Sequence, residues 1–246
     1  MDQNEAIRLL RQGSEGVAEW NRRRLLGEVP PALRRVSLVK AQLSGANLAH
    51  VNLFEADLSG AVLANCSLKN SELSFARFAG ADLIDSDLSH ASGHEANFAF
   101  AKLDRINATS ASFPKGIFRY ATLTQAIISR ASLEAADFAR ANLSGADLAD
   151  ALLQRSNMAS ARLGKANLTR ADLGAACLAG ADLRDSDLKE AHLSHANLSY
   201  ADLTNADLRR SRGRWDTVKG ATFTRTNLSN LRFGWLAEQY EKEQEF

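Results

Sequence analysis

Apolar residues recur every five positions along most of this chain. Counting in fives from Leu33 to Phe233, the residue is nearly always Leu, or else Phe, Ile, Met or Val, and the exceptions are Gly93, Ala108 and Gly213. The residue two positions earlier is usually Ala or Ser, and the one between them is often Asp or Asn. Such fixed-period self-similarity indicates a repeat architecture rather than an ordinary globular domain.

A period of five fits neither the 3.6-residue period of a helix nor the two-residue alternation of a strand. The large and the small apolar positions lie two apart, so they point to one side of a short extended segment. One large and one small side chain together fill a narrow interior. Asp, Asn, Ser and Gly at the remaining positions favour turns. The pattern therefore predicts a coil of short segments and corners, stacked through backbone hydrogen bonds.

The spacing of phenylalanines predicts the size of one coil. Phe78, Phe98, Phe118 and Phe138 are twenty residues apart, and Met158 continues the series. Four pentapeptides per coil would place these rings in one interior ladder, each stacked on the next.

The repeats resemble those of the pentapeptide-repeat proteins, whose pattern is A(D/N)LXX. Matching stretches include Ala146-Asp147-Leu148, Ala171-Asp172-Leu173 and Ala201-Asp202-Leu203, and the resemblance covers roughly four-fifths of the chain. It implies an all-β solenoid, a right-handed quadrilateral β-helix of about ten coils over residues 33–234. We expect short helical segments at both ends.

Residues 1–32 are predicted to form an N-terminal helical cap. A first helix capped by Asn4 or Asp2 would run through Gln12, and a second would span residues 15–26, with Gly13 and Gly16 interrupting the helix. The open end of a stacked coil has unpaired edges that need a cover. A separate binding role for these helices is the alternative.

Residues 235–246 are predicted to form a short acidic helix at the other end. Trp235, Leu236 and Tyr240 would lie on one side of it. This helix would be a second cap. Alternatively, these three residues form a homodimer contact, because some members of the resembled family dimerise through their C-terminal segments.

Two stretches depart from the pattern. Gly93 leaves a hole that Phe113, one coil along, could fill, and Pro114 would remove one ladder hydrogen bond. We expect local distortion between Ala91 and Gly116. The segment 211–216, around Gly213, has inward positions that are too small, and it is predicted to bulge as a loop.

The composition of the chain indicates where in the cell the protein is located. The net charge is +1, the chain has two cysteines, and it has no apolar run long enough to span a membrane. Cys66 and Cys177 would lie too many coils apart to pair, which favours a reducing compartment. These features predict a cytoplasmic protein of a bacterial type that does not bind nucleic acid.

The sequence shows no set of residues typical of catalysis, cofactor binding or metal binding. The polar series from Asn47 to Asn227 repeats every twenty residues, so we interpret these side chains as hydrogen-bonding nearby backbone groups at the turns. The five histidines do not converge, and no Ser–His–Asp arrangement has a supporting sequence context. We therefore predict that the protein is not an enzyme and has no cofactor.

Recognition on the outer surface is the remaining function. Phe100 and Tyr120 share one phase and would stack, with Arg140 on the next coil. A second candidate is the basic–aromatic cluster of Arg212, Arg214 and Trp215. We predict a scaffold that presents the outer faces of a rigid β-helix to an unknown partner protein. The alternative is a DNA mimic that binds DNA gyrase or topoisomerase, as in quinolone-resistance members of the family, but the net charge of +1 disfavours it.

Overall fold

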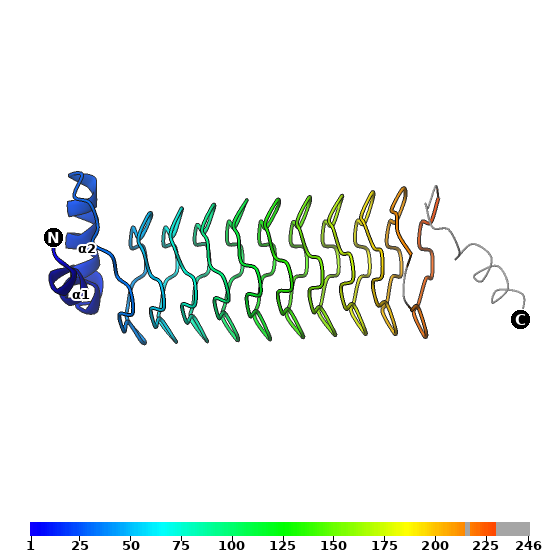
Figure 1. Cartoon of the computed structure of the whole chain (residues 1–246), viewed down its shortest axis with the longest axis horizontal. Helices are drawn as coiled ribbons and strands as arrows, with labels where there is room; N and C mark the ends of the chain where they lie inside the picture. Colours follow the sequence, from blue (N-terminus) through cyan, green and yellow to red (C-terminus); the bar gives the residue numbers. More distant parts are fainter. Residues whose placement is uncertain (215–216, 230–246) are drawn as a thin grey trace, which may run out of the picture.

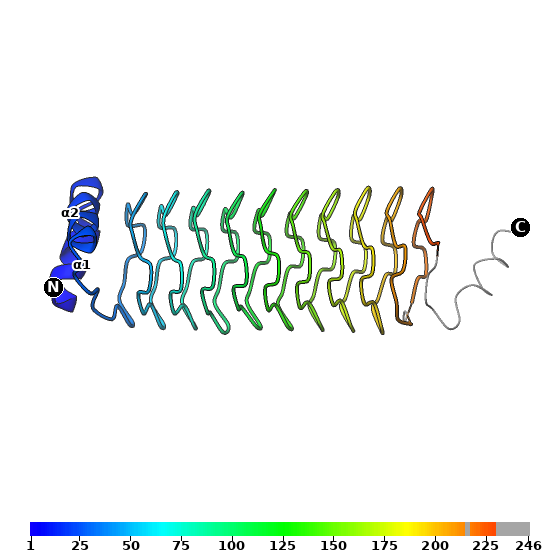
Figure 2. The same ribbon diagram turned by 90° about the horizontal axis from the view of Figure 1, so that it is seen from above.

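Each pentapeptide folds as one short extended segment followed by one turn. In the computed structural model, which describes residues 1–214 and 217–229, parallel β-bridges join residues twenty apart, from Ser37 with Asp57 to Asp207 with Asn227. Four pentapeptides therefore make one coil, and the coils stack into a rod-shaped β-helix (Figures 1 and 2). The predicted period is confirmed. The count of about ten coils over residues 33–234 stays a prediction, because it includes residues outside the described ranges.

The backbone hydrogen bonds run along the rod axis. The Leu38 amide donates to the Asp57 carbonyl at 2.7 Å, and the Asp57 amide donates back to the Val36 carbonyl at 2.8 Å. At each corner a turn closes locally, as where the Ala41 amide donates to the Leu38 carbonyl at 3.1 Å. The second residue of each described corner, from Arg35 to Arg225, has a positive φ near +60°. Only this central residue has a positive φ, which is the pattern of a type II turn.

The interior contains the predicted pairs of small and large apolar residues. Phe78, Phe98, Phe118 and Phe138 are buried and stack with ring centroids 4.8, 5.1 and 4.7 Å apart and interplanar angles below 10°. Met158 follows and is also fully buried. The predicted interior ladder is confirmed.

Two helices cover the N-terminal end of the rod (Figure 1). Helix α1 spans Gln3–Arg11 and helix α2 spans Ser14–Leu25. The Asp2 carboxylate, one of the two predicted caps, accepts a hydrogen bond from the Glu5 amide at 2.8 Å. Gly13 has a φ of +69° and separates the helices, as predicted.

The prediction that Gly16 interrupts a helix is wrong. Gly16 lies inside α2, where a Cβ would come within 1.9 Å of the Leu9 carbonyl oxygen. This glycine is required because the two helices approach closely there. Ala6, Leu10 and Trp20 are fully buried and join the core cluster of the solenoid.

The stretch from Ala91 to Gly116 is regular, so the predicted distortion is wrong. Phe113 fills the space beside Gly93, where an added Cβ would lie 2.6 Å from the ring. The bridge of Ser92 with Ser112 is intact. A cavity of about 10 Å³ remains in the interior near Ile106 and Phe113.

The prediction that Pro114 removes a ladder bond is also wrong. The amide at this corner position does not belong to the ladder: in neighbouring repeats it bonds to a side chain two residues earlier, as where the Ile84 amide donates to Asp82 Oδ1 at 3.2 Å. The ladder uses the carbonyl instead, and the Pro114 carbonyl accepts from the Glu95 amide at 3.0 Å.

The ladder continues to Arg212, which bridges with His192, and is again in register at Thr217, which bridges with Asn197. The predicted bulge therefore does not include Ser211, which is buried, or Arg212, which is paired in the ladder. Trp215 and Asp216 lie outside the described residues, as does the predicted helix at 235–246. The proposed domain boundaries after residues 32 and 234 stay predictions.

Candidate binding surface on the outer corners

Residues twenty apart lie over one another, so the corners form columns of side chains along the rod. In one column, which we call the aromatic–arginine column, Phe100, Tyr120 and Arg140 occupy successive coils. The rings of Phe100 and Tyr120 stack with centroids 5.0 Å apart and an interplanar angle of 2°. Arg140 Nη1 donates to the Tyr120 hydroxyl at 3.0 Å, and its guanidinium carbon lies 5.7 Å from the ring centroid. The predicted stack is confirmed.

The column is open at its N-terminal end. The position before Phe100 in the same column is Gly80, where an added Cβ would meet no atom within 4 Å. One face of the Phe100 ring is therefore stacked on Tyr120 while the other is uncovered, and 64% of the residue is exposed. An uncovered aromatic face can accept a cation or another ring.

A second aromatic group lies at a neighbouring corner but is already paired. Phe54 and Phe75 contact edge to face at 5.7 Å, and Phe75 makes the same kind of contact with His94 at 5.6 Å. The Arg34 guanidinium carbon lies 4.7 Å from the Phe54 centroid. Because these rings already contact one another and Arg34, less of their aromatic surface is available to a binding partner than at Phe100.

The basic cluster near the end of the rod is only partly described. Arg212 and Arg214 are exposed, whereas Trp215 lies outside the described residues. The neighbouring Arg209 forms an ion pair with Asp207 at 2.6 Å. The structure therefore places Arg212 in the ladder but does not test the cluster as a site.

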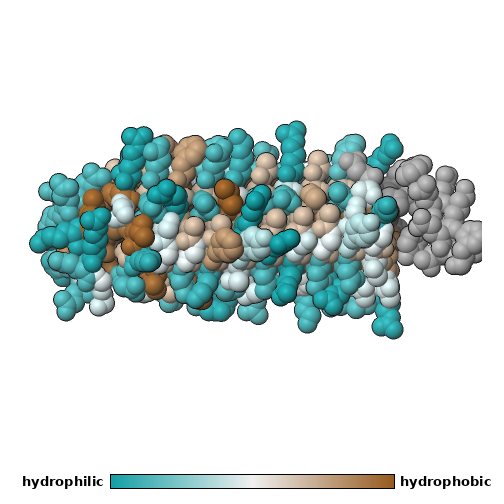
Figure 3. Space-filling model, turned by 90° about the horizontal axis from the view of Figure 1, so that it is seen from below, coloured by the Kyte–Doolittle hydropathy of each residue, from teal (hydrophilic) through white to brown (hydrophobic). Residues whose placement is uncertain are grey.

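Apolar residues also gather at the N-terminal end of the face in Figure 3, where brown atoms lie beside the helices. Near this end of the chain, Leu25, Leu26 and Val29 are 86%, 70% and 80% exposed. They belong to the end of α2 and to its connection with the first coil.

Ion pairs between coils neutralise much of the outer surface. Arg105 pairs with Asp85 and Arg170 with Asp150, each at 2.7 Å and twenty residues apart. The hydrogen bond from Arg170 lowers the pKa of Asp150. Burial raises the pKa of Cys66 to about 12, so this interior thiol is unreactive.

The polar series from Asn47 to Asn227 has the predicted local role. Asn47 Oδ1 accepts from the Ala49 amide at 3.2 Å, and Asp87 Oδ1 accepts from the Ser89 amide at 2.8 Å. Among the residues that the structure describes, no three His, Cys, Asp or Glu side chains form a group able to hold a metal.

The structure does bring together one Asp–His–Ser arrangement that the sequence analysis missed. His192 Nδ1 lies 3.1 Å from Asp172 Oδ1, and His192 Nε2 lies 2.7 Å from Ser194 Oγ. The sequence signal was the twenty-residue spacing of Asp172 and His192, which places them on adjacent coils. Asp172 and His192 form a β-bridge on an outer face of the rod, and Ser194 begins the adjoining corner. The interior cavity near Ile106 and Phe113 does not involve them. A triad needs oxyanion donors and a site that excludes water before it can catalyse acyl transfer.

Neither α1 nor α2, nor any other helix within residues 1–214 and 217–229, has the length and hydrophobicity of a transmembrane segment.

Comparison with known proteins identifies the repeats. The family model described as pentapeptide repeats matches eight copies, over residues 33–70, 71–107, 94–130, 117–155, 136–174 and 176–212. None of the curated proteins searched matches the chain.

Similar solved structures include the following three. HetL, a pentapeptide repeat protein involved in heterocyst differentiation regulation from the cyanobacterium Nostoc sp. strain PCC 7120, is 27% identical over 87% of this chain and 95% of its own, with a TM-score of 0.42. QnrB1, a plasmid-mediated fluoroquinolone resistance protein, is 18% identical over 78% and 90%, with a TM-score of 0.35. Rfr23 from the cyanobacterium Cyanothece 51142 is 32% identical over 40% and 60%, with a TM-score of 0.23.

The matched repeats cover most of the chain, and the twenty-residue ladder is the one that their pattern implies. The chain therefore belongs to the pentapeptide-repeat family, whose fold is a right-handed β-helix.

Proposed function

We propose that this protein is a non-enzymatic interaction scaffold, and that a partner protein docks on the aromatic–arginine column. The observation that supports this most is the uncovered ring face of Phe100, beside Gly80, on a residue 64% exposed. A few residues dominate the binding energy at protein interfaces, and Tyr, Trp and Arg are enriched among them.

The column is well suited to docking because it is held in place before a partner arrives. The amides of Phe100 and Tyr120 donate to the carbonyls of Arg119 and Ala139 at 2.9 and 3.2 Å, which fixes the backbone under the rings. Stacking and the bond from Arg140 then fix the side chains. Such preorganisation reduces the entropy lost on binding.

Other parts of the proposal lie partly outside the described residues. The cluster of Arg212, Arg214 and Trp215 is a second candidate contact, and a homodimer through Trp235, Leu236 and Tyr240 stays a proposal. A cytoplasmic location also stays a proposal, supported by the two free thiols of Cys66 and Cys177.

The matched test uses two aromatic residues of the same column. Phe100 and Tyr200 are both 64% exposed and are one hundred residues apart. A partner captured from lysate by the wild-type protein should bind the Tyr200→Ala variant equally. Binding to Phe100→Ala and Arg140→Ala should fall by about tenfold or more, as for a hot-spot residue. Equal capture by all four proteins would contradict docking at this column.

The DNA-mimic alternative makes a different prediction. Carboxylates that could imitate DNA phosphates, such as Asp57 and Asp82, are paired with Arg77 and Lys102 on the next coil. We expect an excess of the protein to leave DNA supercoiling by gyrase unchanged. A concentration-dependent change would favour the alternative.

The non-enzymatic assignment is tested at Ser194. We expect a fluorophosphonate probe, which reacts with activated serines, to leave Ser194 unlabelled, because the Asp172–His192–Ser194 group lies on the outer surface, where the side chains of Asp172 and His192 are 29% and 34% exposed to water. Labelling that disappears in His192→Ala would show an activated nucleophile and overturn the assignment.

A further inference from the structure

The N-terminal edge of the first coil has no preceding coil to pair with. In the second coil every corresponding group is bonded to the first: the Val62 amide donates to the Ala41 carbonyl, and the Val62 carbonyl accepts from the Leu43 amide. In the first coil these groups must find other partners or remain open.

On one side of this edge, side chains of the two helices form hydrogen bonds with the backbone groups that lack a preceding coil. Trp20 Nε1 donates to the Asn47 carbonyl, and Asn21 Oδ1 accepts from the Asn47 amide, both at 2.8 Å. Arg24 Nη2 donates to the Ala49 carbonyl at 2.8 Å. On the next side, Arg11 Nη2 donates to the Ser37 carbonyl at 2.8 Å.

A third side of the edge, along residues 39–42, has no such partners. Among the hydrogen bonds of the described residues, none involves the amide or carbonyl of Gln42, or the carbonyl of Val39. Their counterparts one coil along, at Val62 and Ser59, are all in the ladder. One backbone donor, the Gln42 amide, and two backbone acceptors, the carbonyls of Val39 and Gln42, are therefore available for hydrogen bonds.

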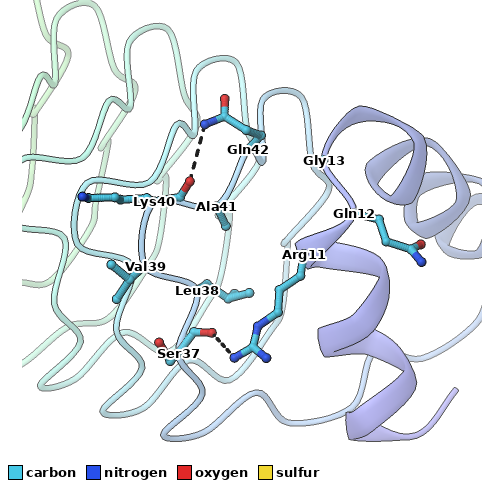
Figure 4. A pocket seen from close by; sticks show the side chains of 9 residues that line it. All are labelled: Arg11, Gln12, Gly13, Ser37, Leu38, Val39, Lys40, Ala41 and Gln42. Atoms are coloured by element: carbon cyan, nitrogen blue, oxygen red, sulfur yellow. Dashed lines mark hydrogen bonds between the residues drawn. The ribbon is translucent and has the colours of Figure 1, made fainter.

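A groove lies directly against this open edge. It has a volume of about 530 Å³ and separates the end of α1 and Gly13 from residues 37–42 of the first coil (Figure 4). Arg11 reaches across it to the Ser37 carbonyl, whereas the side chain of Lys40, which also lines it, points away from the helices over Gly60 of the second coil (Figure 4). None of the residues that line the groove is acidic.

We propose that this groove binds an extended acidic peptide segment of a partner, which adds to the first coil as a further β-segment. The backbone of the peptide pairs with the Gln42 amide and carbonyl and donates to the Val39 carbonyl, replacing the bonds that a preceding coil would make. Its carboxylates lie near Arg11, and the exposed, flexible side chain of Lys40 turns toward them from its position over Gly60. Lys40 lies in the same column as Phe100 but three coils away from it, so binding in the groove does not depend on docking at Phe100.

The test follows the Gln42 amide directly. The probe is the acetylated and amidated peptide Glu-Val-Glu-Val-Glu, added to the full-length protein and monitored by NMR-detected amide hydrogen exchange. We expect exchange at Gln42 to slow by about tenfold or more at saturating peptide. The Val62 amide, already bonded in the free protein, should not change and serves as the internal control.

Two control peptides separate strand addition from simple charge attraction. A peptide of the same length with Lys in place of Glu should bind more weakly. A Glu peptide with methylated backbone nitrogens keeps the charge but lacks the donors, and it should not protect Gln42. Equal binding of the methylated peptide, binding without protection of Gln42, or no binding at millimolar peptide would each overturn the proposal.

A matched pair of variants tests the charge. Lys40→Glu should weaken binding of the Glu peptide by about threefold or more, whereas Lys69→Glu, the same change one coil along at a different corner, should not. Lys40→Glu should fold normally, because Glu55 and Glu95 already occupy this corner position with φ values of +56° and +55°. Equal weakening by both variants would leave only non-specific attraction and would overturn the proposal.

Discussion

At the scale of single residues, the corner position is the unusual feature of this protein. A residue other than glycine with positive φ is disfavoured by about 1–2 kcal/mol, because its Cβ approaches the following carbonyl oxygen. Yet Arg, Glu, His and even Phe adopt φ near +60° at the corners. The turn and the ladder on both sides fix this conformation, so the chain tolerates the strain at coil after coil.

The corner strain predicts the effect of glycine at Ala135. This residue is exposed and has a φ of +54°, so Ala135→Gly removes strain and loses no contact that the structure shows. We expect stability to rise by up to about 1 kcal/mol, after allowing for the greater unfolded-state entropy of glycine. Ala159→Gly, one position before a corner residue, should instead destabilise by about 0.5–1 kcal/mol. Urea unfolding measures both, and equal effects would contradict the explanation.

A second prediction concerns acid sensitivity at Asp104. Partial burial raises the pKa of this carboxyl, but hydrogen bonds from the Thr122 and Thr124 hydroxyls and the Thr124 amide outweigh it and leave the pKa below its ordinary value. The stability that Asp104 contributes is therefore complete above its unfolded pKa of about 3.9 and is lost as the pH falls further.

The Asp104→Asn variant measures this contribution, because Asn keeps an accepting oxygen but does not titrate. We expect the urea midpoint to fall less between pH 7 and pH 3 in the variant than in the wild-type protein. An identical fall would show that Asp104 does not contribute.

At the scale of elements, helices α1 and α2 cap the first coil in two ways, largely through different side chains. Ala6, Leu10 and Trp20 cover the apolar interior of the first coil, and Trp20, Asn21 and Arg24 replace missing ladder partners. Trp20 does both, since its ring is fully buried while its Nε1 reaches the Asn47 carbonyl.

Trp20→Phe should separate these two roles. The variant keeps an aromatic ring in the interior but leaves the Asn47 carbonyl without its donor, which should destabilise the protein by about 1–3 kcal/mol. Arg22→Ala, which removes an exposed partner of Glu19 on the same helix, should have little effect. Thermal melting of both variants tests this, and a Trp20→Phe variant as stable as the wild-type protein would contradict it.

At the scale of the whole molecule, the rod is a one-dimensional stack in which each coil contacts only its neighbours. The bridges join residues twenty apart throughout residues 37–227 of the described structure. The register is therefore preserved by any change that removes a whole coil.

Deleting residues 141–160 tests this modularity. The deletion removes four pentapeptides and joins Arg140 to Ala161, so small and large positions stay in phase. We expect a folded, slightly less stable rod with a single cooperative melting transition and a similar circular dichroism spectrum per residue. Loss of the cooperative transition would mean that the coils are not equivalent.

The sequence predicted the structure correctly where the same pattern repeats along the chain. It predicted it poorly where the local structure depends on one particular contact. The spacing of Phe78 and Phe98 predicted their stacking, because identical phases must lie over one another. The consequence of Pro114 was predicted wrongly, because sequence does not show which amide of a repeat enters the ladder. The sequence analysis did not predict the Asp172–His192–Ser194 group, because Asp172 and His192 lie twenty residues apart and only the stacking of coils brings them together.

What the sequence by itself determined is the β-helix, its four-sided coil and the phase of every column, including Phe100 over Tyr120. The physical reason is that a strict five-residue period leaves one arrangement in which all large side chains point inward. Only the tertiary structure decided how the end is closed: that Gly16 lets the helices approach, that Trp20 and Arg24 complete one side of the first coil, and that Gln42 is left open beside a groove. Those contacts join parts of the chain that share no period, so no repeat could predict them.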